Sequence, residues 1–365
     1  MRIKPFVLVI VLFSIFMGCT QDETDNQNFK GYVFTMSNAS NGNELLQYKI
    51  NSNGTLNLIA SVPTTGLGSG SNLASQGSVI LSVNKKTVFV VNAGDHSIST
   101  FSILPNGSIT LVGKYFLQGI RPISITQREN LVYVLCSQGA TGTASIEGFM
   151  MTTTGALTPI TNSFLNLTSD VNPAQISFVH NGVLVVSERV SNKLTTYTLN
   201  SILHTPTFSQ SITTLSTQPY GFAVNSIGQI FVTEASASSA VSSYSITQTG
   251  IINSISSLSN AQSGACWAAI NSTSTICYSS NAGANTISSF TISPSGSLTS
   301  TQTAIELGMG NSPLDIGVSS NDEFLFVLAG TSDKILPFKI NGNNLSPIAT
   351  TPIYVPGSAY GLAVY

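Results

Sequence analysis

The chain has 365 residues, and its 13 basic and 15 acidic side chains give a formal net charge of −2. No basic patch with interleaved aromatic residues is present, which argues against a nucleic-acid partner. Serine, threonine, asparagine and glycine dominate the polar residues, as expected for solvated strands and tight turns. A single closed β-architecture can account for the whole length.

The first residues predict an export signal. Arg2 and Lys4 precede an apolar run from Phe6 to Met17, which is short for a membrane span, and Gly18-Cys19 ends it. Residues 1–19 are therefore expected to be a signal segment that ends at Cys19 and is not part of the fold.

This segment resembles the signal of bacterial lipoproteins. The resemblance implies cleavage before Cys19, attachment of lipid to its thiol and, with Thr20 next, sorting to the outer membrane of the cell envelope. An ordinary secretory signal, which would give a secreted protein, is the alternative. Residues 20–31 are polar and predict a solvated tether, and their acidic side chains also resemble a surface-export tag.

A repeat runs through the rest of the chain. Seven aromatic residues recur at spacings of 46 to 53 residues, and in five copies a glycine follows six positions later. Units of this length built from short strands are typical of a β-propeller. The repeated aromatic residues are Tyr48, Phe101, Phe149, Tyr197, Tyr244, Phe290 and Phe338.

Each unit is expected to form four antiparallel strands. Several first strands open with proline, which a strand tolerates at its first residue. An apolar second strand, a third strand with the repeated aromatic residue, and a glycine turn into the fourth strand follow. The opening prolines are Pro122, Pro173, Pro219 and Pro313.

The two ends of the chain predict how the ring closes. The unit of Tyr48 lacks a first strand upstream, whereas the segment from Ala359 to Tyr365 has no unit after it and matches the segment from Pro219 to Asn225. We therefore expect the C-terminal strand to complete the first blade. Residues 32–365 are then an all-β, seven-bladed propeller without an open edge between the termini.

Three cysteines lie within the expected propeller. Cys266 and Cys277 flank a predicted hairpin turn, so they form either a disulfide in the exported protein or two buried thiols. Cys136 ends an apolar strand and is expected in the core.

The motif from Asn92 to Asp95, followed by Asn106-Gly107, resembles the repeat of the lactonase family of seven-bladed propellers, which includes 6-phosphogluconolactonase-like enzymes and uncharacterised secreted members. Asn281-Ala-Gly283 repeats the motif, and the stretch from Gly264 to Trp267 is similar to the uncharacterised members. The resemblance extends over residues 32–365.

The resemblance also implies where catalysis would take place. Enzymatic members carry Pro-Arg-His at the opening of one blade and a glutamate at the end of that blade's second strand. Here the opening is Pro173-Ala174-Gln175, whereas the glutamate is kept as Glu188. Because no histidine remains there to relay a proton, the family mechanism lacks a component, and Glu188 is the candidate acid/base.

Strand direction predicts a polar rim. The ends of second strands and the starts of first strands meet at one end of the channel because these strands are antiparallel. Arginines there could bind a carboxylate while the acids accept hydroxyl protons; alternatively, these residues cap strand ends and pair with one another. The rim residues are Asn92, Arg121, Asp170, Asn172, Glu188, Arg189, Glu234, Asn281 and Asp315.

Three functions follow from these features. The first is a lipid-anchored binding module that holds a small molecule or protein at the rim. The second is a hydrolase that opens a sugar lactone through Glu188, and the third is a structural surface protein. The sequence contains no Ser/His/Asp arrangement, metal-ligand spacing or phosphate loop, so no cofactor or metal is expected.

Overall fold

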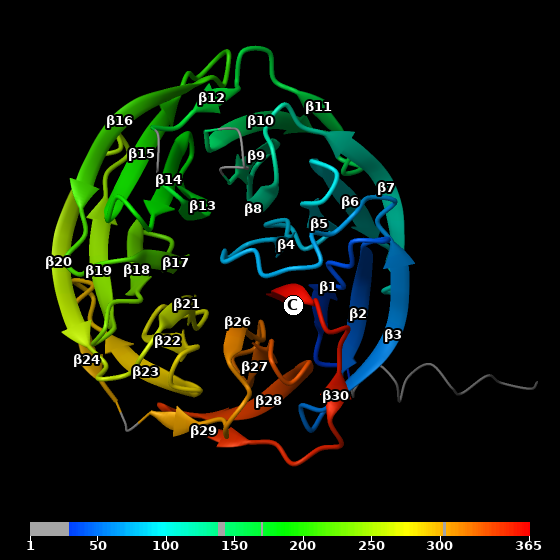
Figure 1. Cartoon of the computed structure of the whole chain (residues 1–365), viewed down its shortest axis with the longest axis vertical. Coiled ribbons are helices and arrows are strands. Elements are labelled where there is room, and N and C mark those ends of the chain that lie inside the picture. The colour runs from blue at the N-terminus through cyan, green and yellow to red at the C-terminus, as the bar shows by residue number, and fades with distance from the viewer. Residues whose placement is uncertain (1–28, 138–142, 169–170, 302–303) are drawn as a thin grey trace, which may run out of the picture.

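Seven antiparallel sheets form a closed ring around a central channel (Figure 1). The computed structural model describes residues 29–137, 143–168, 171–301 and 304–365, so the signal segment and Cys19 lie outside the described residues. Within the described residues no helix is long and apolar enough to cross a membrane. The predicted seven-bladed propeller is confirmed.

The first strand of each blade lines the channel, and the second packs behind it. The first strands are β31 (Tyr360–Val364), β4 (Val79–Leu81), β8 (Pro122–Arg128), β13 (Pro173–His180), β17 (Pro219–Val224), β21 (Ala265–Ile270) and β26 (Pro313–Val318). The second strands are β1 (Tyr32–Met36), β5 (Thr87–Asn92), β9 (Leu131–Cys136), β14 (Val183–Glu188), β18 (Gln229–Glu234), β22 (Ile276–Asn281) and β27 (Phe324–Ala329).

The third strands carry the repeated aromatic residues, and the fourth form the outer wall. The third strands are β2 (Glu44–Ile50), β6 (Ser97–Ile103), β10 (Ser145–Met151), β15 (Lys193–Leu199), β19 (Ala240–Ile246), β23 (Thr286–Ile292) and β28 (Lys334–Asn341). The fourth strands are β3 (Leu56–Pro63), β7 (Ile109–Phe116), β11 (Leu157–Pro159), β16 (Pro206–Thr213), β20 (Ile252–Ser259), β24 (Leu298–Ser300) and β29 (Asn344–Pro347).

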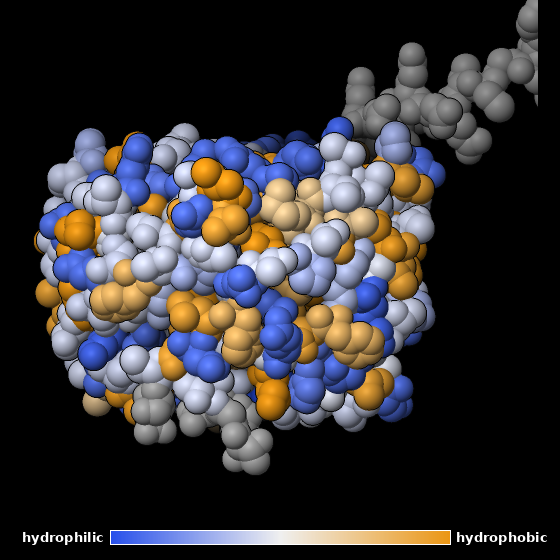
Figure 2. Space-filling view, turned by 90° about the horizontal axis from the view of Figure 1, so that it is seen from above, coloured by the Kyte–Doolittle hydropathy of each residue, from blue (hydrophilic) through white to orange (hydrophobic). Residues whose placement is uncertain are grey.

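Three short strands also pair with third strands at the outer wall. They are β12 (Leu165–Asn166), β25 (Ile305–Glu306) and β30 (Ile353–Tyr354). Polar and apolar side chains are mixed on the side of the ring seen in Figure 2. This mixture agrees with the pattern of fourth strands such as β16, in which exposed and half-buried residues are interspersed.

The core lies between the blades. All seven repeated aromatic residues are at most 5% exposed, which confirms their packing role. The second strands are buried along their whole length, as expected for strands covered on both faces. Cys136, Cys266 and Cys277 are buried free thiols, and the register places Ile270, not Cys266, opposite Cys277. The structure therefore decides between the two alternatives in favour of unbridged cysteines.

The C-terminal strand closes the ring as predicted. β31 pairs with β1 through Val364 opposite Val33 and Tyr360 opposite Met36. The Phe29 ring packs at a tilt against Tyr32, with 4.8 Å between ring centres, and the Lys30 ammonium lies 3.1 Å from the Glu323 carboxylate, so packing against the propeller begins just before β1.

Candidate functional site

Four of the predicted rim residues occupy the same position, the last residue of a second strand. Asn92, Glu188, Glu234 and Asn281 end β5, β14, β18 and β22, and each is at most 2% exposed. Their side chains bond groups of the protein itself: all four bond hydroxyls of their own blades, and the two asparagines also accept hydrogen bonds from residues that precede their blades. The expectation that they face a ligand at the rim is therefore not met by this geometry.

The two asparagines make the same hydrogen bonds in different blades. The Asn92 amide donates to the hydroxyls of Ser97 and Ser99, at 3.1 and 2.9 Å. Asn281 donates to Thr286 and Ser288, five and seven residues further on, at 3.0 and 2.9 Å. Each amide therefore connects the end of a second strand to the start of the third strand. Because the same bonds occur in two blades, the asparagine belongs to the structural repeat.

The two glutamates also accept hydrogen bonds from hydroxyls of their own blades. Ser191 donates to Glu188 Oε2 at 2.7 Å. Glu234 accepts hydrogen bonds from Ser242 and from the Tyr244 hydroxyl, and burial raises the pKa of its carboxyl. A carboxylate at 2% exposure with a local donor is poorly placed to act on a ligand in the channel. Glu188, the predicted acid/base, is thus buried and held by Ser191, as a residue that stabilises the fold would be.

The positions of the family's Arg-His pair lie at the start of β13. Ala174 is completely buried, and the Gln175 amide exchanges two hydrogen bonds with the backbone of Phe222 on β17, at 3.0 and 2.6 Å. Gln175 therefore bridges two first strands. Because its nitrogen and its oxygen both bond the backbone of one residue, and an amide does not titrate near neutral pH, Gln175 cannot replace a histidine in proton transfer.

The chain itself crosses the channel beneath the rim. Residues 72–78, here called the crossing segment, precede β4 and reach over the centre of the ring (Figure 1). The Gln76 amide bonds both backbone groups of Ala268 on β21, at 2.7 and 3.1 Å, and the Gln76 N–H donates to Ala174 on β13. The space in which the family residues would meet a substrate therefore contains the crossing segment.

Ser75 anchors the same segment to three other places. Its hydroxyl donates to the Ile123 carbonyl on β8, its N–H donates to the Tyr360 hydroxyl on β31, and its carbonyl accepts the Trp267 indole N–H at 2.9 Å. Together with Gln76, these bonds reach the first strands of four other blades, β8, β13, β21 and β31. Sequence analysis did not single out this segment, which belongs to no repeat.

Arg121 and Asn172 occupy a second repeated position, directly before the proline of a first strand. Both have left-handed backbone angles, with φ of 56° and 43°, and Gln218 and Ser312 share this conformation before Pro219 and Pro313. The Arg121 guanidinium donates to the Asn72 carbonyl at 3.1 Å. Arg121 therefore holds the start of the crossing segment and does not join Arg189.

Arg189 and Asn172 lie together in a rim pocket of about 460 Å³, which is lined by Asn172, Arg189, Val190, Asn192, Thr217, Gln218 and Tyr220. The guanidinium donates to the Asn172 side chain at 2.6 Å and to the Tyr220 hydroxyl at 2.8 Å, and it lies 4.7 Å from the centre of the Tyr220 ring. Among the described residues no carboxylate lies within 4 Å of it. Sequence analysis singled out only Asn172 and Arg189 among these lining residues, and it missed Tyr220, which bonds the guanidinium.

Asp315 lies away from both arginines, inside the channel. It is 1% exposed, and its carboxylate accepts the N–H groups of Ile316 and Leu362 at 2.9 and 3.1 Å. Burial raises the pKa of this carboxyl to about 7. Because Leu362 belongs to the closing strand, Asp315 ties β26 to β31, and the prediction that it binds a ligand at the rim has no support in this placement.

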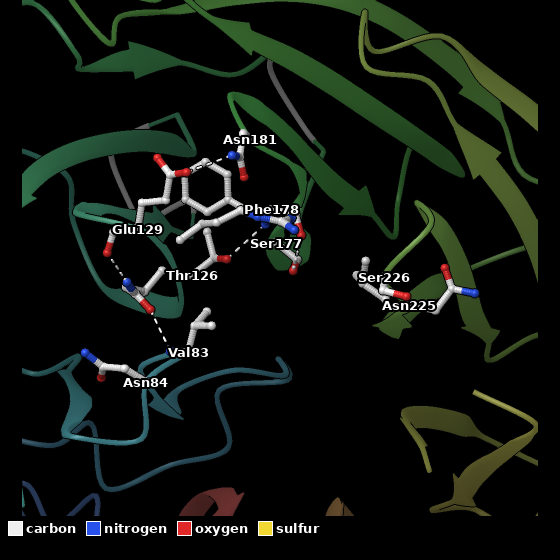
Figure 3. Close-up of a pocket in the computed structure, with 12 residues that line it drawn as sticks. Val83, Asn84, Thr126, Glu129, Ser177, Phe178, Asn181, Asn225 and Ser226 are labelled. Carbon is white, nitrogen blue, oxygen red and sulfur yellow. Dashed lines mark hydrogen bonds between the residues drawn. The ribbon is translucent and has the colours of Figure 1, made fainter. Parts of the chain in front are cut away.

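A larger pocket of about 550 Å³ lies at the opposite end of the channel. We call it the mouth pocket. The turns between the first and second strands of four consecutive blades enclose it, and side chains from these turns surround an open space (Figure 3). Its labelled residues are Val83, Asn84, Thr126, Glu129, Ser177, Phe178, Asn181, Asn225 and Ser226.

The comparisons with known proteins agree with this architecture. The sequence model described as Lactonase, 7-bladed beta-propeller matches residues 27–165, 143–268 and 256–357. No protein among the curated ones matches the chain.

Several solved structures share the fold at low sequence identity. A putative 6-phosphogluconolactonase from Bacteroides fragilis is 15% identical, with a TM-score of 0.72 over 91% of this chain and 97% of that one. A protein from Lactobacillus plantarum is 17% identical, with a TM-score of 0.73 over 92% and 98%. A periplasmic gluconolactonase from Pseudomonas aeruginosa is 13% identical, with a TM-score of 0.72 over 91% and 98%. These likenesses show the fold.

Proposed function

Because the chain belongs to the lactonase family of seven-bladed β-propellers, we propose that it is a member that binds a ligand without opening a lactone ring. The observation that carries this proposal is the arrangement of Gln76 and Gln175. The nitrogen and the oxygen of both amides bond the backbone of first strands, β21 for Gln76 and β17 for Gln175, in the place where the family's Arg-His pair would act. Glu188 is buried beside Ser191.

The ligand we propose for the rim pocket is a small hydroxy-carboxylate such as a sugar acid. The Arg189 guanidinium has no carboxylate partner among the described residues, so a carboxylate ligand would supply one. Tyr220 holds the guanidinium by a hydrogen bond and offers an aromatic surface. Asn192 and Gln218, which also line the pocket, provide side-chain amides for hydroxyl groups.

Calorimetric titration with D-gluconate and D-galacturonate tests this proposal. We expect at least one to bind, and we expect Arg189→Ala and Arg189→Gln to weaken binding at least about tenfold, equivalent to about 1.4 kcal/mol. Arg121→Ala is the matched control, because that rim arginine bonds Asn72 and does not line the pocket. Neither acid binding, or equal losses in the Arg121 and Arg189 variants, would refute the assignment.

Turnover separates this proposal from the hydrolase alternative. The same protein is expected to leave glucono-δ-lactone and 6-phosphogluconolactone opening at their spontaneous rates in a pH-stat. If ring opening were accelerated and Glu188→Gln abolished the acceleration, the chain would be a lactonase, and the binding-only proposal would be wrong.

We further propose that the propeller is held at the cell envelope by lipid on Cys19. The support is the sequence pattern of a basic start, a short apolar run and Gly18-Cys19, followed by a polar segment. Cys19→Ala is expected to move the protein from the membrane fraction to the soluble fraction of its host cells. Continued sedimentation with membranes would contradict lipid anchoring at this residue.

A further inference from the structure

We propose that the mouth pocket is a second binding site, which takes a neutral saccharide of one or two rings. The proposal is independent of the function proposed for the rim, because the two pockets share no lining residue and lie at opposite ends of the channel. With about 550 Å³, the mouth pocket is within the size range of small-molecule sites.

The walls of the pocket are held in place before any ligand binds. The Gln127 amide accepts the Val83 N–H at 2.8 Å and donates to the Glu129 carbonyl, so it joins two neighbouring turns. The Asn181 amide donates to Glu129 Oε1 at 2.7 Å, and one Arg128 nitrogen donates to the Val179 carbonyl at 3.0 Å. The turns of three successive blades are therefore cross-linked, which reduces the entropy lost when a ligand binds.

These same side chains keep polar groups for a ligand. Within the described residues, the remaining nitrogens of Arg128, the Asn84 amide nitrogen, Glu129 Oε2 and Asn181 Oδ1 have no hydrogen-bond partner. The pocket thus offers two donor side chains and two acceptor side chains. Each sugar hydroxyl can donate and accept, so a saccharide can satisfy both kinds.

The charges of the pocket favour a neutral ligand. Nine of its twelve lining residues are polar, but only Arg128 and Glu129 carry charge, and they are adjacent in one turn. Either charge would repel an ion that the other attracts. The apolar residues Phe178, Val224 and Val83 supply carbon surface for the C–H faces of a sugar ring, and Val83 is 70% exposed at the edge. In Figure 3 the Phe178 ring lies near Glu129 and Asn181, and Ser226 lies on the other side of the opening beside Asn225.

Saturation-transfer NMR and calorimetry with D-glucose, maltose and cellobiose test the proposal. At least one is expected to bind with a Kd below about 1 mM. Ser226→Trp places a bulky ring at the exposed pocket edge and is expected to abolish binding, whereas Thr273→Trp, in an equivalent turn outside the pocket, is the matched control. Asn84→Asp and Arg128→Lys are each expected to lower the affinity about fivefold or more, because each removes a donor.

Three results would overturn the proposal. They are the absence of binding by all three sugars, binding that Ser226→Trp leaves unchanged, and tighter binding of D-gluconate or of the peptide Ala-Ala-Ala in the mouth pocket. Arg189→Ala is expected to leave sugar binding unchanged. Because this variant alters only the rim pocket, a failure of the rim proposal can be told apart from a failure of the mouth-pocket proposal.

Discussion

Deletion of residues 359–365 is expected to lower the Tm by at least about 10 °C. The deletion removes β31, which contributes Tyr360, Leu362 and Ala363 to the core at 1 to 8% exposure. Burial of such a tyrosine or leucine contributes about 1.5–3 kcal/mol each. Loss of the hydrogen bonds to β1 and of the contact between Asp315 and Leu362 adds to this, so the sum approaches the whole stability of an ordinary domain. Differential scanning calorimetry measures the effect.

A complementation experiment shows whether the lower Tm results from loss of the strand that closes the ring. The truncated protein exposes the channel-side edge of β1, and a synthetic peptide of residues 356–365 can pair with that edge as an added strand. We expect the peptide to restore much of the Tm, while a scrambled peptide does not. An unchanged transition after the deletion would contradict closure of the ring by β31.

Gly221→Ala is expected to destabilise the protein by about 2–4 kcal/mol. A methyl group at this position of β17 would lie 2.1 Å from the Gln76 amide oxygen and 2.9 Å from the Cys266 carbonyl. Gln76 would have to leave, and both backbone groups of Ala268 would lose their partner inside the channel. Chemical denaturation of the variant and the unmodified protein gives the difference in the free energy of unfolding.

A double-mutant cycle tests whether Gln76 is the cause. In a Gln76→Ala background the methyl group at residue 221 no longer meets an amide, so Gly221→Ala is expected to cost at least 1 kcal/mol less there, as for other directly contacting pairs. Gly317→Ala provides a comparison on β26, where the added methyl group would meet Val364 and not the crossing segment. Strictly additive effects of the Gly221 and Gln76 substitutions would show that the crossing segment does not depend on this contact.

The parts of the fold that repeat were predictable from the sequence. The aromatic residue recurs seven times and the opening proline four times, and each follows from packing or from proline geometry. The unmatched C-terminal strand could be recognised because it resembles the first strands of this repeat. The rim position of Glu188 and Asn281 also followed from strand direction. The role of these two residues could not be predicted in this way, because both side chains turn into their blades and bond hydroxyls there.

The crossing segment could not be predicted, for a physical reason. Gln76 bonds Ala268, which is 192 residues away in the sequence, and Ser75 bonds Tyr360 at the far end of the chain. Nothing in the polar stretch around them repeats or alternates, and such partners meet only after the ring has closed. The same holds for Tyr220, whose role depends on its position beside Arg189 from the preceding blade.

The measurement that tests the account most directly is parallel titration and turnover on one preparation of the unmodified protein. We expect a sugar acid to bind in a manner that depends on Arg189, and lactones to open at the spontaneous rate. Accelerated lactone opening that Glu188→Gln abolishes would contradict the account.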